Sequence, residues 1–243
     1  MENHVYLPNE IFNDFKKYIK PKHNQFAYAY YYYITYLYRY CKWYVDEKVT
    51  QSMIKQKLQL YENDKNVNYL IKKDGLLEQI GYVKTTTNYP IAWTMENGLV
   101  EFKMVEEHNH EHHITTIIPD RGFKVKTPVK SFFRKQSSEK EKILDGTFYE
   151  VENTHKIDYK IFEKCMNDKD LGVNAFYIYG YIKHKNVISN KYKLPSRNVK
   201  GELMMSDATF RKYARSLEEN KMIIIDAQKF VGEKGFANGY TVL

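Results

Sequence analysis

The side chains best placed for chemistry in this sequence are basic and polar groups that recur at helical spacing in the segment 206–223. Apolar Phe210, Ala214 and Leu217, with Tyr213 beside them, repeat every three or four residues, which predicts a helix with one buried face. Basic and polar side chains on the opposite face donate to base edges and phosphates, as in a DNA recognition helix. The residues expected on that outer face are Thr209, Arg211, Lys212 and Arg215.

A second set of such residues lies in the segment 66–80 of the first half of the chain. An asparagine can pair bidentately with adenine, and a lysine can contact guanine or phosphate. Gly75 stands where the second segment has Arg215, so the first segment has the poorer basic face. The residues expected to face DNA here are Asn68, Tyr69, Lys72 and Lys73.

Further contacts are expected outside these two helices. The helix that precedes a recognition helix crosses the DNA backbone, and a β-hairpin after it can add lysines. The phosphate-binding candidates are Ser196, Arg197 and Lys200, and the hairpin candidates are Lys84 and Lys234.

The two segments belong to an internal repeat. Asn66 and Ser206 are separated by 140 residues, as are Leu77 and Leu217, and both members of the first pair are good helix N-caps. The opening of each half is repeated as well, with Ile11-Phe12 matched by Ile161-Phe162. The two halves are therefore expected to share one order of elements.

That order predicts an α+β protein made of two winged-helix modules joined by a β-rich connector. In each half an aromatic helix (26–44 or 175–185) is followed by a short segment that ends at a leucine (Leu58 or Leu203), and then by the longer helix. A strand-turn-strand pattern closes each half, as YVKTTT, NYP and IAWTM in the first and as MIIIDAQKF, GEKG and FANGYTVL in the second. The expected boundaries are 1–95, 96–147 and 148–243, with a polar loop at 134–142.

The aromatic helix FAYAYYYYITYLYRYCKWY contains nine tyrosines in residues 26–44. Aromatic rings can stack on unpaired bases, but a helix that is apolar on most sides is usually buried. We expect a scaffold helix that packs against its own module and against the second module, the connector or a second copy of the chain in a homodimer. Its narrow polar edge is expected near Thr35, Arg39 and Lys42.

Composition favours a soluble, cytoplasmic protein. The net charge is +8, with +4 in residues 1–95 (13 basic, 9 acidic), −1 in 96–150 and +5 in 151–243, so two basic blocks are available for a polyanion. Cys41 and Cys165 lie in apolar helical patterns and are expected to be reduced packing residues. No signal peptide is expected, and the aromatic helix is too rich in tyrosine to span a membrane.

Other patterns argue against an enzyme. The cluster EEHNHEHH (106–113) lacks the hydrophobic middle residue of a His-hydrophobic-His nuclease site, so a polar loop or hairpin tip is favoured and no metal site is assigned, although incidental metal binding by these histidines stays open. No glycine-rich phosphate loop and no G-x-S-x-G elbow occurs, so no cofactor is expected. Asp168 and Asp170, with Glu163, are interpreted as helix-end and turn residues.

The segments FYIYGYIKHKN and LPSRNVKGELMMSDATFRKYARSLEENKMI resemble helix-turn-helix proteins of plasmids and phages of low-GC Gram-positive bacteria. Tandem winged helices in a chain of this length also resemble plasmid replication initiators. The resemblance covers the second half better than the first. It implies binding to double-stranded DNA, recruitment of host replication proteins or repression of promoters, and no catalysis.

Two alternatives remain open at this point. Winged helices also bind proteins, so the chain can be an interaction module that inhibits a host factor. A metal-dependent rolling-circle nuclease, which would use the histidines at 108–113, is the weaker alternative.

Overall fold

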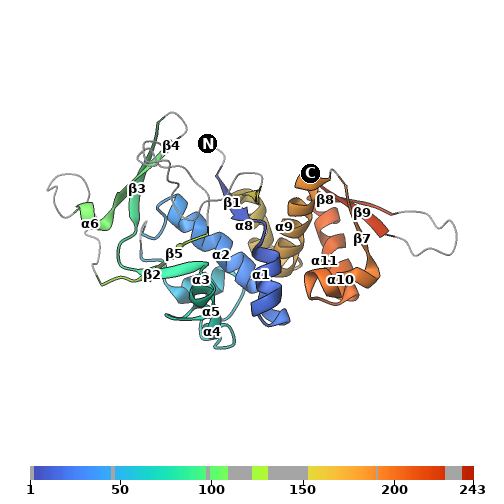
Figure 1. Ribbon diagram of the computed structural model, residues 1–243, viewed down its shortest axis with the longest axis horizontal. Coiled ribbons are helices and arrows are strands. Elements are labelled where there is room, and N and C mark those ends of the chain that lie inside the picture. The colour runs from blue at the N-terminus through green and yellow to red at the C-terminus, as the bar shows by residue number, and fades with distance from the viewer. Residues whose placement is uncertain are drawn as a thin grey trace.

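The two halves of the chain lie side by side and meet along a central layer of helices and one short sheet (Figure 1). The computed structural model describes residues 3–44, 47–96, 99–108, 122–130, 153–189, 191–227 and 237–243. Helices and small antiparallel sheets make up both halves, which confirms the α+β class.

The first half opens with a strand and two helices that lead to the aromatic helix, and then forms short helices and strands. Its elements are β1 (His4–Pro8), α1 (Ile11–Tyr18), η1 (Pro21–His23), α2 (Asn24–Arg39), α3 (Gln51–Lys57), α4 (Asn68–Ile71), α5 (Leu76–Gln79), β2 (Val83–Thr86), β3 (Pro90–Glu96), β4 (Leu99–Met104), α6 (Val105–His108) and β5 (Val125–Pro128).

The second half begins with the same strand-helix-helix order and has longer helices. Its elements are β6 (Thr154–Asp158), α8 (Tyr159–Asn167), α9 (Gly172–Ile188), β7 (Tyr192–Pro195), α10 (Ser196–Leu203), α11 (Asp207–Glu219), β8 (Ile223–Asp226) and β9 (Ala237–Val242).

The opening strands of the two halves pair with each other, and their register has two-fold symmetry. In antiparallel β1 and β6, His4 pairs with Asp158 and Pro8 pairs with Thr154. At the offset of 150 residues that relates the two openings, Asp158 is the equivalent of Pro8 and Thr154 is the equivalent of His4. The partners are thus exchanged, as an axis between Tyr6 and Lys156 requires. The repeat seen in the sequence is therefore arranged in space like the two protomers of a dimer.

The aromatic helix α2 lies in the core, as expected. Tyr28, Tyr30, Tyr31 and Tyr32 have no exposed surface, and the helix contacts α9 of the second half, β1, and β5 of the segment assigned to the connector. These four rings are not available to stack on bases. Thr35 is also buried, with its hydroxyl donating to the Tyr31 carbonyl, so the polar edge is wrong at Thr35, whereas Arg39 is half-buried and Lys42 is exposed.

Helices α2 and α9 cross where α9 has a glycine. The Tyr28 side chain lies against Gly180, and a Cβ at that position would overlap the tyrosine hydroxyl. Tyr32 packs against Phe176 in the same crossing, with 5.0 Å between the ring centroids. The absence of a side chain at Gly180 lets the two helices approach each other closely.

The buried tyrosine hydroxyls of α2 find hydrogen-bond partners around the crossing, as expected for buried polar groups. The Tyr28 hydroxyl lies 2.7 Å from Nε2 of His155 in β6, and Nδ1 of His155 lies 3.0 Å from Oδ1 of Asn9. Since the asparagine oxygen can only accept, Nδ1 carries the proton and Nε2 accepts from the tyrosine. Tyr30 donates to Gln51 at 2.9 Å, and Tyr32 donates to the carbonyl of Ile157 at 3.2 Å.

The second half closes with the expected hairpin. Antiparallel β8 and β9 pair from Ile223–Val242 to Asp226–Gly239, and β7 joins the other edge of β9, which gives the order β7-β9-β8. Helix α11 begins after Ser206, whose hydroxyl accepts from the amide of Thr209 at 3.0 Å, so the predicted N-cap is confirmed.

The strands of the first half pair differently from the prediction. The hairpin expected between YVKTTT and IAWTM is wrong, because β2 pairs with β5 and β3 pairs with β4. A segment of 38 residues (87–124) thus separates two paired strands, and the boundary expected at residue 95 lies inside β3. Period and propensity identify strands but do not identify partners that lie this far apart in the chain.

The single helix expected over 66–80 is also wrong, because the chain forms α4 and α5 instead. Asp74 adopts φ +57°, and a Cβ on Gly75 would lie 2.8 Å from the carbonyl oxygens of Leu70 and Lys72. Asn66 is not the N-cap, since Val67 occupies that position without a side-chain cap. The tight turn at 72–75 therefore divides the segment that the repeat pattern joins.

Both cysteines are free and buried, as expected, and burial raises the pKa of each thiol to about 12. Among the described helices, none is both long and apolar enough to cross a bilayer.

Gly180→Ala should destabilise the protein by about 1–3 kcal/mol, because the added methyl group overlaps the Tyr28 hydroxyl at the helix crossing. Gly201→Ala is the matched control. Gly201 lies in α10 with open space around its Cβ position, so the same change should stabilise by up to about 1 kcal/mol. Urea denaturation measures both free energies of unfolding, and equal effects would contradict the close packing at Gly180.

Stability should decrease as the pH falls from about 6.5 towards 4. Burial lowers the pKa of His155 well below its ordinary value, with His184 and Lys183 adding to the effect, and burial and Lys185 lower the pKa of His184 to about 4. The unfolded chain therefore binds more protons than the folded one in this window, and each histidine contributes a slope of up to about 1.4 kcal/mol per pH unit.

A variant tests this origin of the pH dependence. Nδ1 of His184 is buried without a hydrogen-bond partner, so His184→Leu should be tolerated at pH 7 and should reduce the slope between pH 6.5 and 5. Denaturation at each pH measures the slope. An unchanged slope in the variant would exclude His184 as a contributor.

Candidate nucleic-acid interface

Helix α11 has the two faces that the sequence predicts. Phe210, Ala214 and Leu217 are buried, while Tyr213 is half-buried and accepts from the Asn174 side chain of α9 at 3.2 Å. The Phe210 ring packs edge-on against Tyr240 of β9 at 5.3 Å. This inner face fixes α11 between α9 and the hairpin, and Arg211, Lys212 and Arg215 are exposed on the other side.

The candidate DNA-contacting side chains on α11 differ in their exposure and in the internal contacts that they form. Thr209 is half-buried, and its hydroxyl lies 2.8 Å from that of Ser206. Nε of Arg211 forms an exposed ion pair with Asp207 at 2.8 Å, which partly neutralises it. Lys212 has its ammonium group 5.1 Å from the centroid of the Tyr213 ring. Lys212 and Arg215 are thus the cations of this face best placed to contact a second molecule.

Helix α10 precedes α11 and presents one candidate on its surface. Val199 and Leu203 are buried, and Lys200 is exposed. Met204 ends the helix with φ +56°, which turns the chain into α11. Ser196 and Arg197 form the first turn of α10, but their side chains are outside what the structure describes, as is residue Lys234.

In the first half, Asn68 is held by an internal contact. Lys55 of α3 is buried and donates to Oδ1 of Asn68 at 2.8 Å and to the carbonyl of Asp64 at 2.6 Å. Because the side-chain oxygen of Asn68 is already engaged, the bidentate contact to adenine expected from the sequence would require this bond to break.

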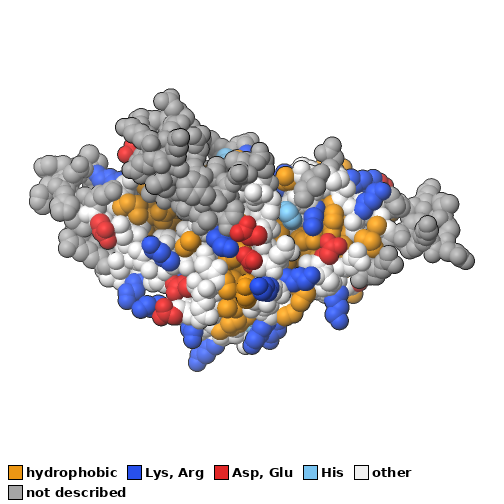
Figure 2. All heavy atoms as spheres, in the orientation of Figure 1, with side chains coloured by type: hydrophobic (Ala, Val, Ile, Leu, Met, Phe, Trp, Pro, Cys, Tyr) orange, Lys and Arg blue, Asp and Glu red, His pale blue; other side chains and the backbone are white. Residues whose placement is uncertain are grey.

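The remaining candidate DNA-contacting residues of the first half lie on several different elements. Tyr69 is half-buried, and its hydroxyl lies 3.0 Å from Nδ1 of His23 in η1. Lys72 and Lys73, in the turn between α4 and α5, are exposed, and Lys84 is exposed on β2. Figure 2 shows lysine and arginine side chains along the lower edge of the molecule, below α4, α1 and α10.

Lys126 of β5 is a structural residue that the sequence reasoning missed. Its ammonium group is buried and donates to the Lys72 carbonyl at 2.9 Å and to Glu78 at 2.7 Å, which ties the turn at 72–75 to α5. Burial acts to raise the pKa of Glu78, but hydrogen bonds from Lys126, Thr85 and the Asp74 amide outweigh it and lower the pKa. No local pattern signals this contact, because Lys126 comes from 54 residues away.

The acidic residues and the histidine cluster that were not assigned to a catalytic or metal site lie as follows. Asp168 caps the end of α8 and accepts from the Asp170 amide at 2.8 Å, so its interpretation as a turn residue is confirmed. Residues 109–113 of the histidine cluster are outside the described residues. Within the part of the chain that the structure describes, no three His, Cys, Asp or Glu side chains lie close enough to hold a metal ion.

The arrangement offers exposed cations and hydrogen-bond donors in both halves of the chain. This chemistry suits a polyanion whose phosphates are spaced along a surface. A comparison of the chain with protein-family models, curated proteins and solved structures finds no match in any of the three.

Proposed function

We propose that the protein binds double-stranded DNA in a sequence-specific manner, with α11 as the principal recognition helix. The observation that carries the proposal is the division of α11 into a buried face and a face with three exposed cations. The adjacent helix α10 adds Lys200 beside it. Such a helix enters a major groove while the preceding helix contacts the backbone.

The order of elements in the second half supports a winged-helix unit. Helix α9 is followed by β7, helices α10 and α11, and the hairpin of β8 and β9, and β7 completes a three-stranded sheet. In such a unit the hairpin projects beside the recognition helix and can contact the DNA backbone.

The first half offers fewer side chains for reading bases than α11 does. Its α4 and α5 are short, Asn68 is bound to Lys55, and the exposed cations are Lys72, Lys73 and Lys84. We propose that this unit holds phosphates and contributes less to base recognition than α11 does. A replication initiator or a transcription regulator of a mobile element is the biological role that this proposal favours.

Selection of bound duplexes from a random pool should return a consensus sequence, and the affinity for that site should fall steeply with salt because several phosphates are neutralised. Sequencing genomic DNA bound to the protein then separates the two roles. An origin repeat indicates an initiator, and promoters indicate a regulator. No duplex binding at low salt would refute the proposal and favour a protein-binding module.

Lys212→Ala should weaken binding to the selected site by about 1–3 kcal/mol and relax the preference at one base position. Lys160→Ala on α8 is the control, since Lys160 is exposed on a helix outside both proposed DNA-contacting units. Titration against the selected and scrambled duplexes measures both effects. Equal affinities of Lys212→Ala and the unchanged chain would exclude α11 as the recognition helix.

A further inference from the structure

Four lysines lie on the connection between α1 and α2, which the proposed recognition elements do not include. Lys16 and Lys17 lie in the last turn of α1, Lys20 directly precedes η1, and Lys22 lies within η1. All four side chains are exposed. Residues 15–45 contain no aspartate or glutamate. Within the described ranges, none of the four ammonium groups forms an ion pair with a carboxylate. We call these four residues the lysine ridge.

Nearby lysines of the same half are neutralised by the protein itself. Lys126 pairs with Glu78 at 2.7 Å, and Lys130 lies 3.2 Å from Asp14 and 3.4 Å from Glu10. Asp14 of α1 forms its ion pair with Lys130. The Tyr18 side chain and, to a smaller extent, Asp14 raise the pKa of Lys17, but Lys17 forms no ion pair with Asp14. The ridge keeps its charge available for a molecule outside the chain.

The fold does not require lysines at this connection. The equivalent connection of the second half joins α8 to α9, and it contains Asp168 and Asp170 around Lys169. Asp168 stabilises that turn by accepting from the Asp170 amide. Two equivalent turns thus form with opposite charge, so the positive charge of the ridge is not a consequence of the architecture.

The ridge is fixed against the first proposed DNA-contacting unit. Tyr69 of α4 is bonded to His23 of η1, and the Lys20 ammonium lies 5.2 Å from the centroid of the Tyr69 ring. Burial lowers the pKa of His23, with Lys22 and Lys20 adding to the effect. A neutral His23 holds η1 beside α4 without adding charge of its own.

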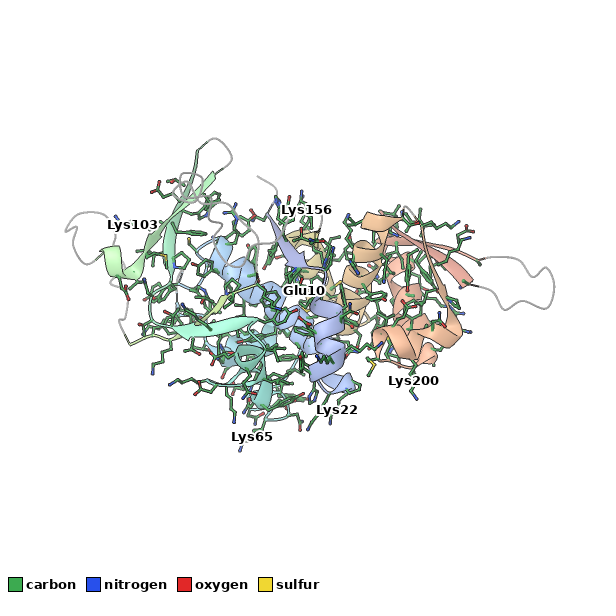
Figure 3. The ribbon with its side chains drawn as sticks, viewed as in Figure 1. Glu10, Lys22, Lys65, Lys103, Lys156 and Lys200 are labelled. Atoms are coloured by element: carbon green, nitrogen blue, oxygen red, sulfur yellow. The ribbon has the colours of Figure 1, made fainter. Side chains whose placement is uncertain are left out.

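The ridge also lies between the two units. Figure 3 shows Lys65 before α4, Lys22 of the ridge and Lys200 of α10 along one lower edge, with Lys22 between the other two. Lys103 and Lys156 are on the upper side in the same view. A duplex that reaches both units along this edge would pass the ridge.

We propose that the lysine ridge binds the phosphate backbone of the duplex segment between the two units. This inference rests on the proposed function, because it assumes that duplex DNA occupies the edge. Lysines on a helix end and a turn reach phosphates rather than base edges, so the ridge adds affinity without sequence preference. It also fixes the position of the first unit relative to the site that α11 reads.

The test replaces all four ridge lysines by glutamine (K16Q, K17Q, K20Q and K22Q) and measures binding to the selected duplex over a range of salt concentrations. Each lost phosphate contact lowers the slope of log K against log salt by about 0.9, so the slope should fall by about 2 to 4. Affinity for scrambled duplex should fall by the same factor as affinity for the selected site, which leaves specificity unchanged.

The matched control removes the same charge from other exposed positions through K42Q, K124Q, K160Q and K169Q. This control should change the slope by less than about 1, and thermal melting should show that both quadruple variants fold. The single variant K22Q should reduce the slope of log K against log salt by about 1, which tests the same proposal with a smaller change to the protein.

The outcomes separate the ridge from the proposed function. If the ridge variant keeps the slope of the unchanged chain while Lys212→Ala still weakens binding, the ridge proposal is refuted and the proposed function stands. An equal loss in the ridge variant and the control would also refute it, since net charge alone would explain the result. If the unchanged chain binds no duplex, both proposals fail.

Discussion

The close crossing of α2 and α9 at Gly180 is the constraint on which the rest of the structure depends. It brings together α2 of the first half and α9 of the second, and it allows the Tyr28 hydroxyl to reach His155. The β1–β6 pair, the α1 side chain Phe12 and the second-half helix α8 all pack around this crossing. The two units outside the core are therefore held in one arrangement rather than connected by a free linker.

The two-fold register at the centre does not extend to identical units at the periphery. The second unit has one continuous helix, α11, with a side-chain cap and a buried stripe. The first unit has two short helices joined by a tight turn, which the buried Lys126 holds through Glu78 and the Lys72 carbonyl. Lys126 arrives on β5 after a long insertion between paired strands. A symmetric core thus supports two surfaces with different chemistry.

The lysines also fall into two groups, those that are buried and those that are exposed. The lysines that enter the interior, Lys55 and Lys126, are satisfied by carbonyl, amide or carboxylate oxygens, because a buried ammonium group without partners would be costly. The lysines of the ridge and of the α10–α11 surface remain in water, where burial imposes no such demand.

The sequence by itself determined the α+β class, the aromatic core helix, the N-cap at Ser206, the faces of α11 and the β8–β9 hairpin. Each of these depends on the spacing of residues that are close in the sequence, such as the repeat of Phe210, Ala214 and Leu217, and such spacing can be read directly from the sequence. Only the tertiary structure decided that β2 pairs with β5, that 66–80 divides into two helices and that Asn68 is bonded to Lys55. Those features depend on contacts between residues far apart in the chain, or on close backbone approach at Gly75, and no periodicity encodes them. The Tyr28–Gly180 crossing belongs to the same class, because the sequence shows the tyrosine and the glycine but not that they meet.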